Sequence, residues 1–260
     1  MANESKIRGE ARSRTKPTAG QQGEQVNVRL TQFGEVMNRP LDRKALAEEG
    51  SYFVAHNTTN DASTTLAGHA APVLADADDT MTKPFVFIRV PTSSTKLIVL
   101  DFIEIEVVTA GANGTQACWA AELDSGATRR SSGGSELTIV NPNMYSSETS
   151  VFSGTTLALM GGPVVSAAES ANNRYLGHGT LRPSIEIAGD IKMFVFGGSP
   201  EIAGTQAGQA AAAIRTSVVA LPPVVLGPEN QFLLALHGQA SQSAAGVYKL
   251  RLGWHERQFT

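Results

Sequence analysis

Cysteine is almost missing from this 260-residue chain, and its scarcity excludes both internal disulfides and cysteine-based metal sites. Cys118 is the single cysteine, so no internal disulfide can form and no cysteine-based zinc site is available. Ala117 and Trp119 flank it, which favours a buried, small apolar side chain over a reactive thiol. We therefore expect Cys118 to be a packing residue.

Charge is also scarce, and long apolar runs are absent. Charged residues make up 17% of the chain, against roughly 25% in typical globular chains. The formal net charge of −3 provides no field that would draw the whole protein to nucleic acid, which we do not expect as a partner. No apolar run reaches the length of about 18 residues that a membrane-spanning helix needs, so no membrane partner is predicted. The basic N-terminus lacks a following apolar segment, so we expect no ordinary secretory signal.

Catalytic and nucleotide-binding motifs are missing too: there is no G-x-S-x-G elbow, P-loop, H-E-x-x-H or C-x-x-C. Asp76, Asp78 and Asp79 could crowd a calcium ion, but the EF-hand pattern is absent and a solvated acidic loop is favoured. Glu104 and Glu106 share one strand face at a spacing that a glycosidase could use, although glutamates on a solvent-facing strand need no such role. The five histidines have no ligand spacing (His56, His69, His178, His237 and His255). We therefore predict no enzyme, no cofactor and no metal site.

Residues 1–25 contain almost nothing apolar and are expected to be a flexible basic arm, because they cannot bury enough surface to offset the entropy of ordering. The arm is either a solvated tail or a segment that orders on a neighbouring subunit. In the second case its cationic residues are the candidate partner-binding residues: Lys6, Arg8, Arg12, Arg14 and Lys16.

Residues 26–50 are predicted to be a linker with one short strand and one short helix. Val26–Leu30 alternates like a strand, and residues 40–49 are the best helical candidate, with Asp42 as a cap and Gly50 as a stop.

Residues 51–260 indicate a β-sandwich, formed as one unit or as two subdomains. The predicted strands are 51–56, 85–90, 97–108, 116–123, 137–140, 156–160, 181–187, 191–196, 216–221, 231–237 and 246–255, with a hairpin turn at 188–190. Within 97–108 the apolar parity changes from Ile98, Leu100 and Phe102 to Ile103, Ile105 and Val107, which predicts a β-bulge or a strand that crosses between sheets. The fold class is therefore all-β, an antiparallel, jelly-roll-like sandwich with one short N-terminal helix and a disordered or extended arm.

Three stretches, 57–83, 124–135 and 161–180, are polar, rich in Gly, Ala and Ser, and are predicted to be long loops. Loops of this length are usually functional or ordered by a partner. One shorter turn, Asn141–Tyr145, carries an aromatic side chain and is interpreted as a plain loop in preference to a ligand contact.

Several segments resemble the uncharacterised structural proteins of tailed bacteriophages. They are Glu49–Ala55, Gly179–Glu186, Pro222–Pro228 and the ending Gly253-Trp-His-Glu-Arg257, and the resemblance spans roughly residues 50–257. In these segments Gly227 and Pro228 would shape a turn, Trp254 would fill the core, and Glu256 and Arg257 would pair. The resemblance implies a homotrimeric decoration, cement or minor head protein, or a tail component.

We therefore expect a virion structural protein that binds the capsid surface through its arm and loops. Its partners would be other copies of the chain and the major capsid protein or another virion protein. The alternative is a glycan-binding β-sandwich module of a phage tail or bacterial surface protein. Aromatic residues are only 6% of the chain, and Tyr145 and Tyr175 would be the sugar-contacting side chains to test.

Overall fold

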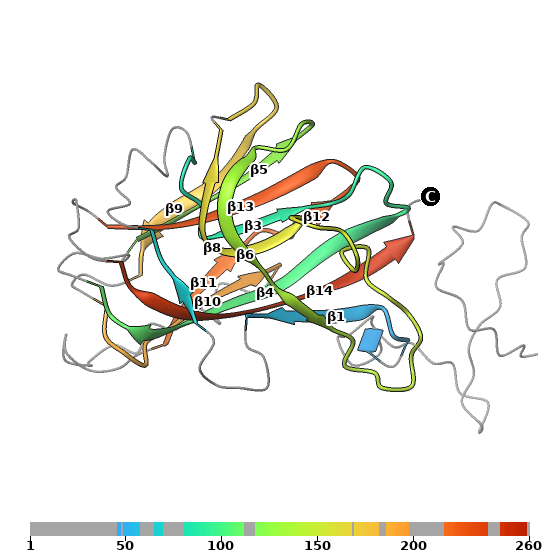
Figure 1. Ribbon diagram of the computed structural model, residues 1–260, viewed down its shortest axis with the longest axis horizontal. Coiled ribbons are helices and arrows are strands. Elements are labelled where there is room, and N and C mark those ends of the chain that lie inside the picture. The colour runs from blue at the N-terminus through green and yellow to red at the C-terminus, as the bar shows by residue number, and fades with distance from the viewer. Residues whose placement is uncertain are drawn as a thin grey trace, which may run out of the picture.

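Alternating apolar and polar side chains fold most of the described chain into strands (Figure 1). The computed structural model describes residues 46–47, 49–57, 65–69, 81–111, 118–167, 169–181, 186–197, 216–238 and 245–258. Its strands are β1 (Tyr52–His56), β2 (Leu66–Ala67), β3 (Val86–Arg89), β4 (Lys96–Thr109), β5 (Cys118–Ser125), β6 (Arg130–Glu136), β7 (Thr138–Val140), β8 (Leu159–Ser166), β9 (Arg174–Thr180), β10 (Ile191–Phe196), β11 (Thr216–Leu221), β12 (Val225–Leu226), β13 (Asn230–His237) and β14 (Val247–Gln258). The predicted arm and the predicted strand Val26–Leu30 lie outside the described residues.

Two sheets are formed, and their strand order is that of a jelly roll. One sheet runs β11-β10-β4-β14-β1-β7, with β12 also paired to β4 and β2 to β14, and the other runs β6-β8-β3-β13-β5-β9. When β1, β3, β4, β5, β9, β10, β13 and β14 are lettered B to I in chain order, the sheets contain the orders B-I-D-G and C-H-E-F. Two Greek keys produce this arrangement. Among the described strands every pairing is antiparallel except that of β10 with β11, so the predicted antiparallel, jelly-roll-like sandwich is confirmed.

Three further strands, β6 to β8, lie between β5 and β9 in the chain and extend both sheets. β7 pairs with β1, β8 pairs with β3, and β6 pairs with β8. The loops predicted over 124–135 and 161–180 are therefore wrong in large part, because β6, most of β8 and β9 lie there. These Gly- and Ser-rich stretches lack a local strand signal. β6 and β9 are the two edges of their sheet, where pairing with one neighbour is enough.

The strand predicted over 181–187 is also displaced: β9 ends at Thr180, and the described residues Leu181, Glu186 and Ile187 are not in a strand. The turn at 188–190 does form, with the Asp190 N–H donating to Ile187 O at 3.0 Å. It does not join a hairpin, since β10 pairs with β4 and β11.

The longest strand, β4, contains the predicted bulge. Its pairing with β14 slips between Gly253 and Trp254, which face Phe102 and Leu100, so Asp101 is the extra residue. Ile98 and Leu100 before the bulge, and Ile103, Ile105 and Val107 after it, are all buried. Phe102 is the exception to the prediction, because the bulge turns it to the outer face, where its ring covers Gly253 and lies 5.7 Å from the Arg251 guanidinium.

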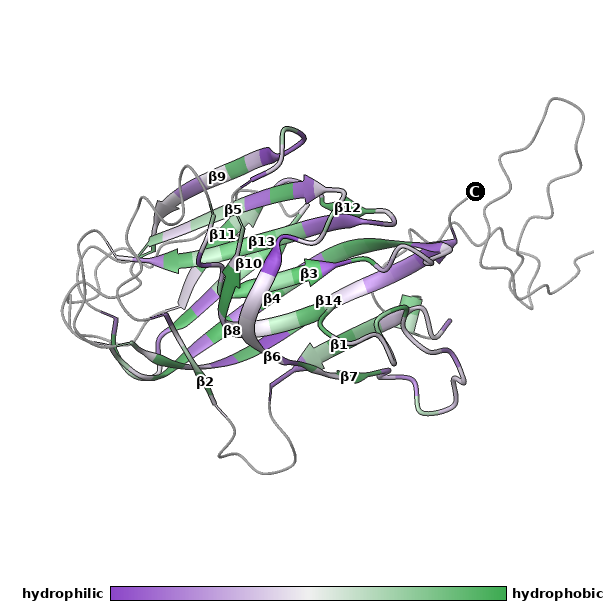
Figure 2. Ribbon diagram, turned by 45° about the horizontal axis from the view of Figure 1, so that its top comes forward, coloured by the Kyte–Doolittle hydropathy of each residue, from purple (hydrophilic) through white to green (hydrophobic). Residues whose placement is uncertain are grey.

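One buried apolar cluster fills the space between the sheets. Phe53, Ile103 and Leu252 from the eight-stranded sheet belong to the same cluster as Ile88 and Phe232 from the six-stranded sheet. Along β14, Tyr248, Leu250, Leu252 and Trp254 are buried and alternate with more exposed polar residues, as predicted. Figure 2 shows this alternation as bands of colour along the strands. Cys118 is buried, as expected.

A second buried cluster lies on the opposite face of the six-stranded sheet. Phe87, Leu233 and Met160 belong to it, and Phe87 alternates along β3 with Val86 and Ile88, which face the main core. This sheet is therefore covered on both faces, which explains why β13 is buried along nearly its whole length.

The predicted helix 40–49 is described only at its end. Leu46 and Ala47 are helical, the Gly50 N–H donates to Ala47 O and the Ser51 N–H to Leu46 O, both at 3.0 Å, and Gly50 has φ 74°. This pair of bonds is a Schellman motif, which ends a helical turn at Gly50, the predicted stop; most of the predicted helix lies outside the described residues.

Candidate functional site: an exposed loop and the network that holds it

The loop that follows β7, residues 141–149, presents the most exposed large apolar side chains of the described structure. Met144 is 94% exposed and Tyr145 is 101% exposed, whereas the next such residue, Val225, is 52% exposed. Isolated exposed apolar residues are common on protein surfaces. Two adjacent ones at full exposure, on a loop with a defined conformation, form a candidate contact point for a partner.

Side-chain hydrogen bonds to the backbone set the conformation of the 141–149 loop. Asn141 Oδ1 accepts the Asn143 N–H, Asn143 Oδ1 accepts the Tyr145 N–H, both at 3.0 Å, and Ser146 Oγ accepts the Glu148 N–H at 3.1 Å. Asn and Ser side chains stabilise turns in this way, because they replace the backbone partners that a strand would provide. The local sequence therefore folds the loop and points Met144 and Tyr145 outward.

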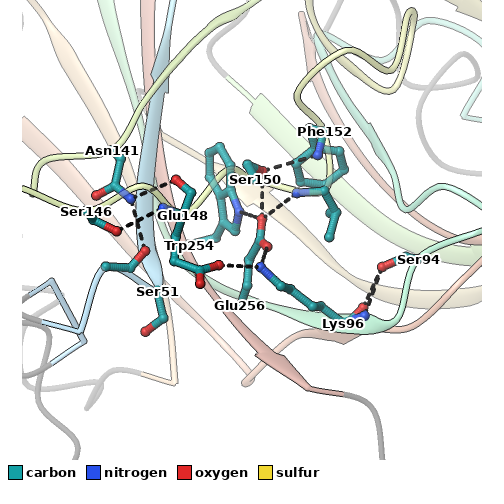
Figure 3. A network of polar contacts seen from close by, with 12 residues as sticks. Ser51, Ser94, Lys96, Asn141, Ser146, Glu148, Ser150, Phe152, Trp254 and Glu256 are labelled. Atoms are coloured by element: carbon teal, nitrogen blue, oxygen red, sulfur yellow. Dashed lines mark hydrogen bonds and ion pairs between the residues drawn. The ribbon is translucent and has the colours of Figure 1, made fainter. Parts of the chain in front are cut away.

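Asn141 also ties the loop to the start of the sandwich. Its Nδ2 donates to Gly50 O at 3.0 Å and to Glu148 O at 3.2 Å (Figure 3). One side-chain amide therefore connects both ends of the loop to Gly50, just before β1. Gly50 is required at this place for two reasons: its φ is positive, and a Cβ would collide with Ser146 Oγ.

Glu256 of β14 holds the segment that follows the loop. Its carboxylate is buried, and Oε1 accepts the Ser150 hydroxyl at 2.6 Å, the Val151 N–H at 3.0 Å and the Trp254 Nε1–H at 3.2 Å (Figure 3). Lys96 Nζ lies 3.3 Å from Oε2. A carboxylate that accepts three donors and faces an ammonium is well compensated for its burial.

Lys96 extends this network to the loop, because the same ammonium lies 3.4 Å from Glu148 Oε2. Glu148 is 56% exposed at its side chain and Glu256 only 1%, so the two carboxylates differ sharply in their surroundings. Trp254 is fully buried, as predicted, and packs against Phe53 and Phe152 with ring centroids 5.9 and 5.5 Å apart. The predicted Glu256–Arg257 pair is wrong: the neighbours alternate across β14, and Arg257 donates to His255 Nε2 at 3.1 Å on the outer face.

A buried ionic cluster lies on the covered outer face of the six-stranded sheet. Arg129 Nη1 donates to Glu122 Oε1 at 2.6 Å and to Asp124 Oδ2 at 3.1 Å, and all three side chains are almost fully buried. Burial raises the pKa of Glu122 despite the arginine. Burial by itself would raise the pKa of Asp124. Hydrogen bonds from Ser170 and Ser125 stabilise its charged form more strongly, so the pKa of Asp124 lies below its ordinary value.

A further buried polar cluster, at the start of β10, contains Lys192, Glu186 and Tyr248. Lys192 Nζ donates to Glu186 Oε2 at 2.5 Å and lies 5.0 Å from the centre of the Tyr248 ring, and the Tyr248 hydroxyl donates to Glu186. Burial lowers the pKa of Lys192 and raises that of Tyr248. These side chains line neither of the two pockets described below, so the cluster has the form of an interior ion pair.

Most of the residues singled out from the sequence lie outside the described structure, and the described glutamates form separate surface ion pairs. Lys6, Arg8, Arg12, Arg14, Lys16 and the Asp76–Asp79 cluster lie outside the described residues. Glu104 lies 2.8 Å from Arg251 Nη2, and Glu106 lies 4.0 Å from Lys249 Nζ, on the outer face of the sheet. Among the described residues no group of three or more His, Cys, Asp or Glu side chains could hold a metal ion. No helix within the described ranges has the length and apolar character that crossing a membrane requires.

Comparison with known proteins finds no match: no family model, no curated protein and no solved structure is significantly similar to this chain. Any function of this chain must therefore be argued from its own residues. Sequence reasoning noted Tyr145 but missed Met144 and the Lys96–Glu256 contact. The Asn-Pro-Asn sequence before Met144 was the available signal for a defined turn, whereas nothing local connects Lys96 with Glu256, 160 positions later (256 minus 96).

Proposed function

We propose that this chain is a bacteriophage virion structural protein, a capsid decoration, cement or minor head protein. It binds the capsid surface through its N-terminal arm and through the 141–149 loop. The observation that carries the proposal is the full exposure of Met144 and Tyr145 on a loop whose turns are hydrogen-bonded internally and anchored to the sandwich.

The chemistry of the loop suits a protein partner. Tyr and Met are enriched at protein–protein interfaces, because they bury a large area and leave few polar groups unsatisfied. A loop that already has its bound conformation loses little conformational entropy on binding. Since Asn141, Ser146 and Glu148 fix the loop before a partner arrives, we expect Met144 and Tyr145 to be its anchors.

The architecture and the arm support the same proposal more weakly. Jelly rolls occur in viral capsid proteins and in lectins, so the fold is compatible with a virion role but cannot select it. The arm carries five cationic residues that would pair with acidic surface on a neighbouring subunit. As a homotrimer the protein would present three arms and three loops, and such multivalency would make weak single contacts sufficient.

The experiment that tests the proposal measures the number of copies on each particle. Phage particles prepared without this protein are mixed with the purified full chain, with Met144→Ser/Tyr145→Ser, or with a variant that lacks residues 1–25. We expect the loop variant to lower occupancy at least tenfold, equivalent to about 1.4 kcal/mol or more per site. Val225→Ser, which removes an exposed apolar side chain elsewhere, serves as the matched control and should bind normally. Normal occupancy for both the loop variant and the arm deletion would refute the proposal.

A glycan-binding module is the second candidate, and one observation favours it. Tyr175 on the edge strand β9 is 41% exposed and lies edge-on to His178, with ring centroids 5.9 Å apart, so its face is held in a fixed position. Aromatic side chains of this kind stack on sugar rings. A glycan array with the purified chain tests this function; saturable binding that is lost in Tyr175→Ala or Tyr145→Ala would favour it over capsid attachment.

A further inference from the structure

A pocket beside the covered face of the six-stranded sheet contains two arginines that have no carboxylate partner among the described residues. It has a volume of about 210 Å³, and the side chains that matter are Arg89, Arg130, Thr128, Thr155, Thr156 and Leu157. A second pocket shares Thr155 and Thr156 with it, so the two lie on either side of this short segment. The first pocket is lined by two arginine side chains, whereas the second is lined by one glutamate.

Arg89 is held in the pocket wall with unused hydrogen-bonding capacity. It is the last residue of β3, and its backbone N–H donates to Ala158 O at 2.7 Å. The one hydrogen bond from its side chain to the described residues is long, from Nη2 to Gly126 O at 3.4 Å. Its Nε is buried and has no hydrogen-bond partner among the described residues. A buried guanidinium N–H without an acceptor is costly, and an arginine in this state is rarely retained for packing alone.

The nearby acidic side chains do not neutralise these arginines. Glu122 and Asp124 on the same face are both bound by Arg129, at 2.6 and 3.1 Å. Arg130 directs Nε and Nη2 to a neutral acceptor, Gly133 O, at 3.2 and 2.7 Å. No described carboxylate lies within 4.0 Å of Arg89 or Arg130, so no direct ion pair among the described residues offsets their two guanidinium charges.

Among the described residues, one acidic side chain lines the neighbouring pocket, and it is bonded to the backbone of the pocket rim. Glu136 accepts the Leu157 N–H at 2.7 Å, which holds Leu157 at a positive φ of 63° on the pocket rim. A bulky residue rarely adopts this backbone region, so the bond from Leu157 to Glu136 offsets part of the conformational cost and fixes the shape of the rim.

We propose that this pocket binds a carboxylate carried by an acidic sugar residue. Guanidinium groups bind carboxylates with charge-assisted hydrogen bonds, and the Thr128 and Thr156 hydroxyls can donate to or accept from sugar hydroxyls. Thr155 Oγ1 donates to Val151 O at 3.2 Å and can still accept from a sugar hydroxyl. The volume suits a group the size of one monosaccharide better than the small carboxylate of a protein side chain. The site goes beyond both functions proposed above, because it uses neither the 141–149 loop nor Tyr175.

Titrating the full chain with sodium glucuronate, sodium acetate and glucose at constant ionic strength tests the site, with binding followed by NMR. We expect glucuronate to bind, acetate to bind at least tenfold more weakly, and glucose not to bind. Arg89→Gln should weaken glucuronate binding at least tenfold. Arg130→Gln, at a more exposed position, should weaken it in the same direction and covers the case in which Arg89→Gln does not fold. Arg174→Gln, on exposed β9, is the matched control and should bind as the unmodified chain does.

Each alternative result has a defined meaning. Equal affinities for acetate and glucuronate would overturn the assignment to a sugar, since the pocket would then recognise a bare carboxylate such as an acidic side chain of a protein. Glucuronate binding that is unchanged in Arg89→Gln and Arg130→Gln, or no binding at all, would overturn the site itself. None of these results bears on the loss of particle occupancy expected for Met144→Ser/Tyr145→Ser, so the two proposals fail independently.

Discussion

Replacing Glu256 by glutamine should destabilise the protein and loosen the 141–149 loop, although the change removes only one charge. Glutamine keeps an oxygen that can accept the Ser150, Val151 and Trp254 donors. A hydrogen bond to a charged group contributes about 1.5–3 kcal/mol and one to a neutral group about 1 kcal/mol. The loss is therefore at least about 0.5 kcal/mol for each of the three bonds.

Two further terms act in opposite directions. The new amide places its NH₂ toward Lys96 Nζ, which lies 3.3 Å from Oε2 in the unmodified protein, and this costs about another 0.5–1 kcal/mol. Against this, a neutral amide is easier to bury than a carboxylate. We expect a net decrease of about 2 kcal/mol in the free energy of unfolding.

The assay is urea denaturation followed by tryptophan fluorescence, to which Trp254 contributes because it is fully buried against Phe53 and Phe152. With a urea m value of about 2–3 kcal/mol/M, the midpoint should fall by roughly 0.7–1 M. Hydrogen exchange at the Val151 amide should accelerate in the folded protein, because its acceptor is weakened.

Glu148→Gln is the matched control, since it removes the other carboxylate that contacts Lys96, at 3.4 Å, from an exposed position. It should change stability by less than about 0.5 kcal/mol. If both variants shift the midpoint equally, or if Glu256→Gln leaves it unchanged, the reasoning that Glu256 anchors this segment is refuted.

Three further predictions concern single residues. Gly50→Ala should destabilise by about 1–3 kcal/mol, because alanine disfavours a positive φ and its Cβ meets Ser146 Oγ; a melting temperature equal to that of the unmodified chain would contradict this. Arg129→Met should cost about 3–5 kcal/mol in chemical denaturation, since two buried carboxylates lose their counter-charge; a neutral effect would mean that the cluster contributes nothing. Burial first, and then Arg257, lowers the pKa of His255 to about 4. The folded protein holds His255 in its neutral form, and the stability that depends on this neutral form is complete above the unfolded pKa of about 6.5. It is lost as the pH falls toward 4, because the unfolded chain takes up the proton first. Discounted for partial exposure, the unmodified chain should lose about 1 kcal/mol more than His255→Gln between about pH 7 and about pH 5, and parallel stability curves would exclude the effect.

Local patterns were enough to predict the sandwich and several of its details. The parity change within 97–108 predicted a bulge in β4 that the structure contains, and the alternation of 246–255 predicted the buried face of β14. Such patterns are reliable because the side chains of a strand alternate between faces, so the sequence itself records which residues must avoid water.

Pairing across long distances decided the rest. β6, β9 and the part of β8 after Met160 carry no local strand signal and form because a neighbouring strand offers backbone partners. Phe102 faces outward because the bulge precedes it and Gly253 leaves room for its ring. Glu256 bonds to Ser150 and Lys96, not to its neighbour Arg257, because the fold brings together segments more than a hundred residues apart.

The candidate sites divide in the same way. The sequence by itself determined that the chain has a β-rich body and a polar Asn-rich turn at Tyr145, since composition and alternation are local properties. Only the tertiary structure decided that Met144 and Tyr145 project fully and that Arg89 and Arg130 line one pocket in which no described residue supplies a carboxylate. Exposure and charge balance depend on what lies beside a residue in space, and β-sheet pairing sets those neighbours without regard to their distance along the chain.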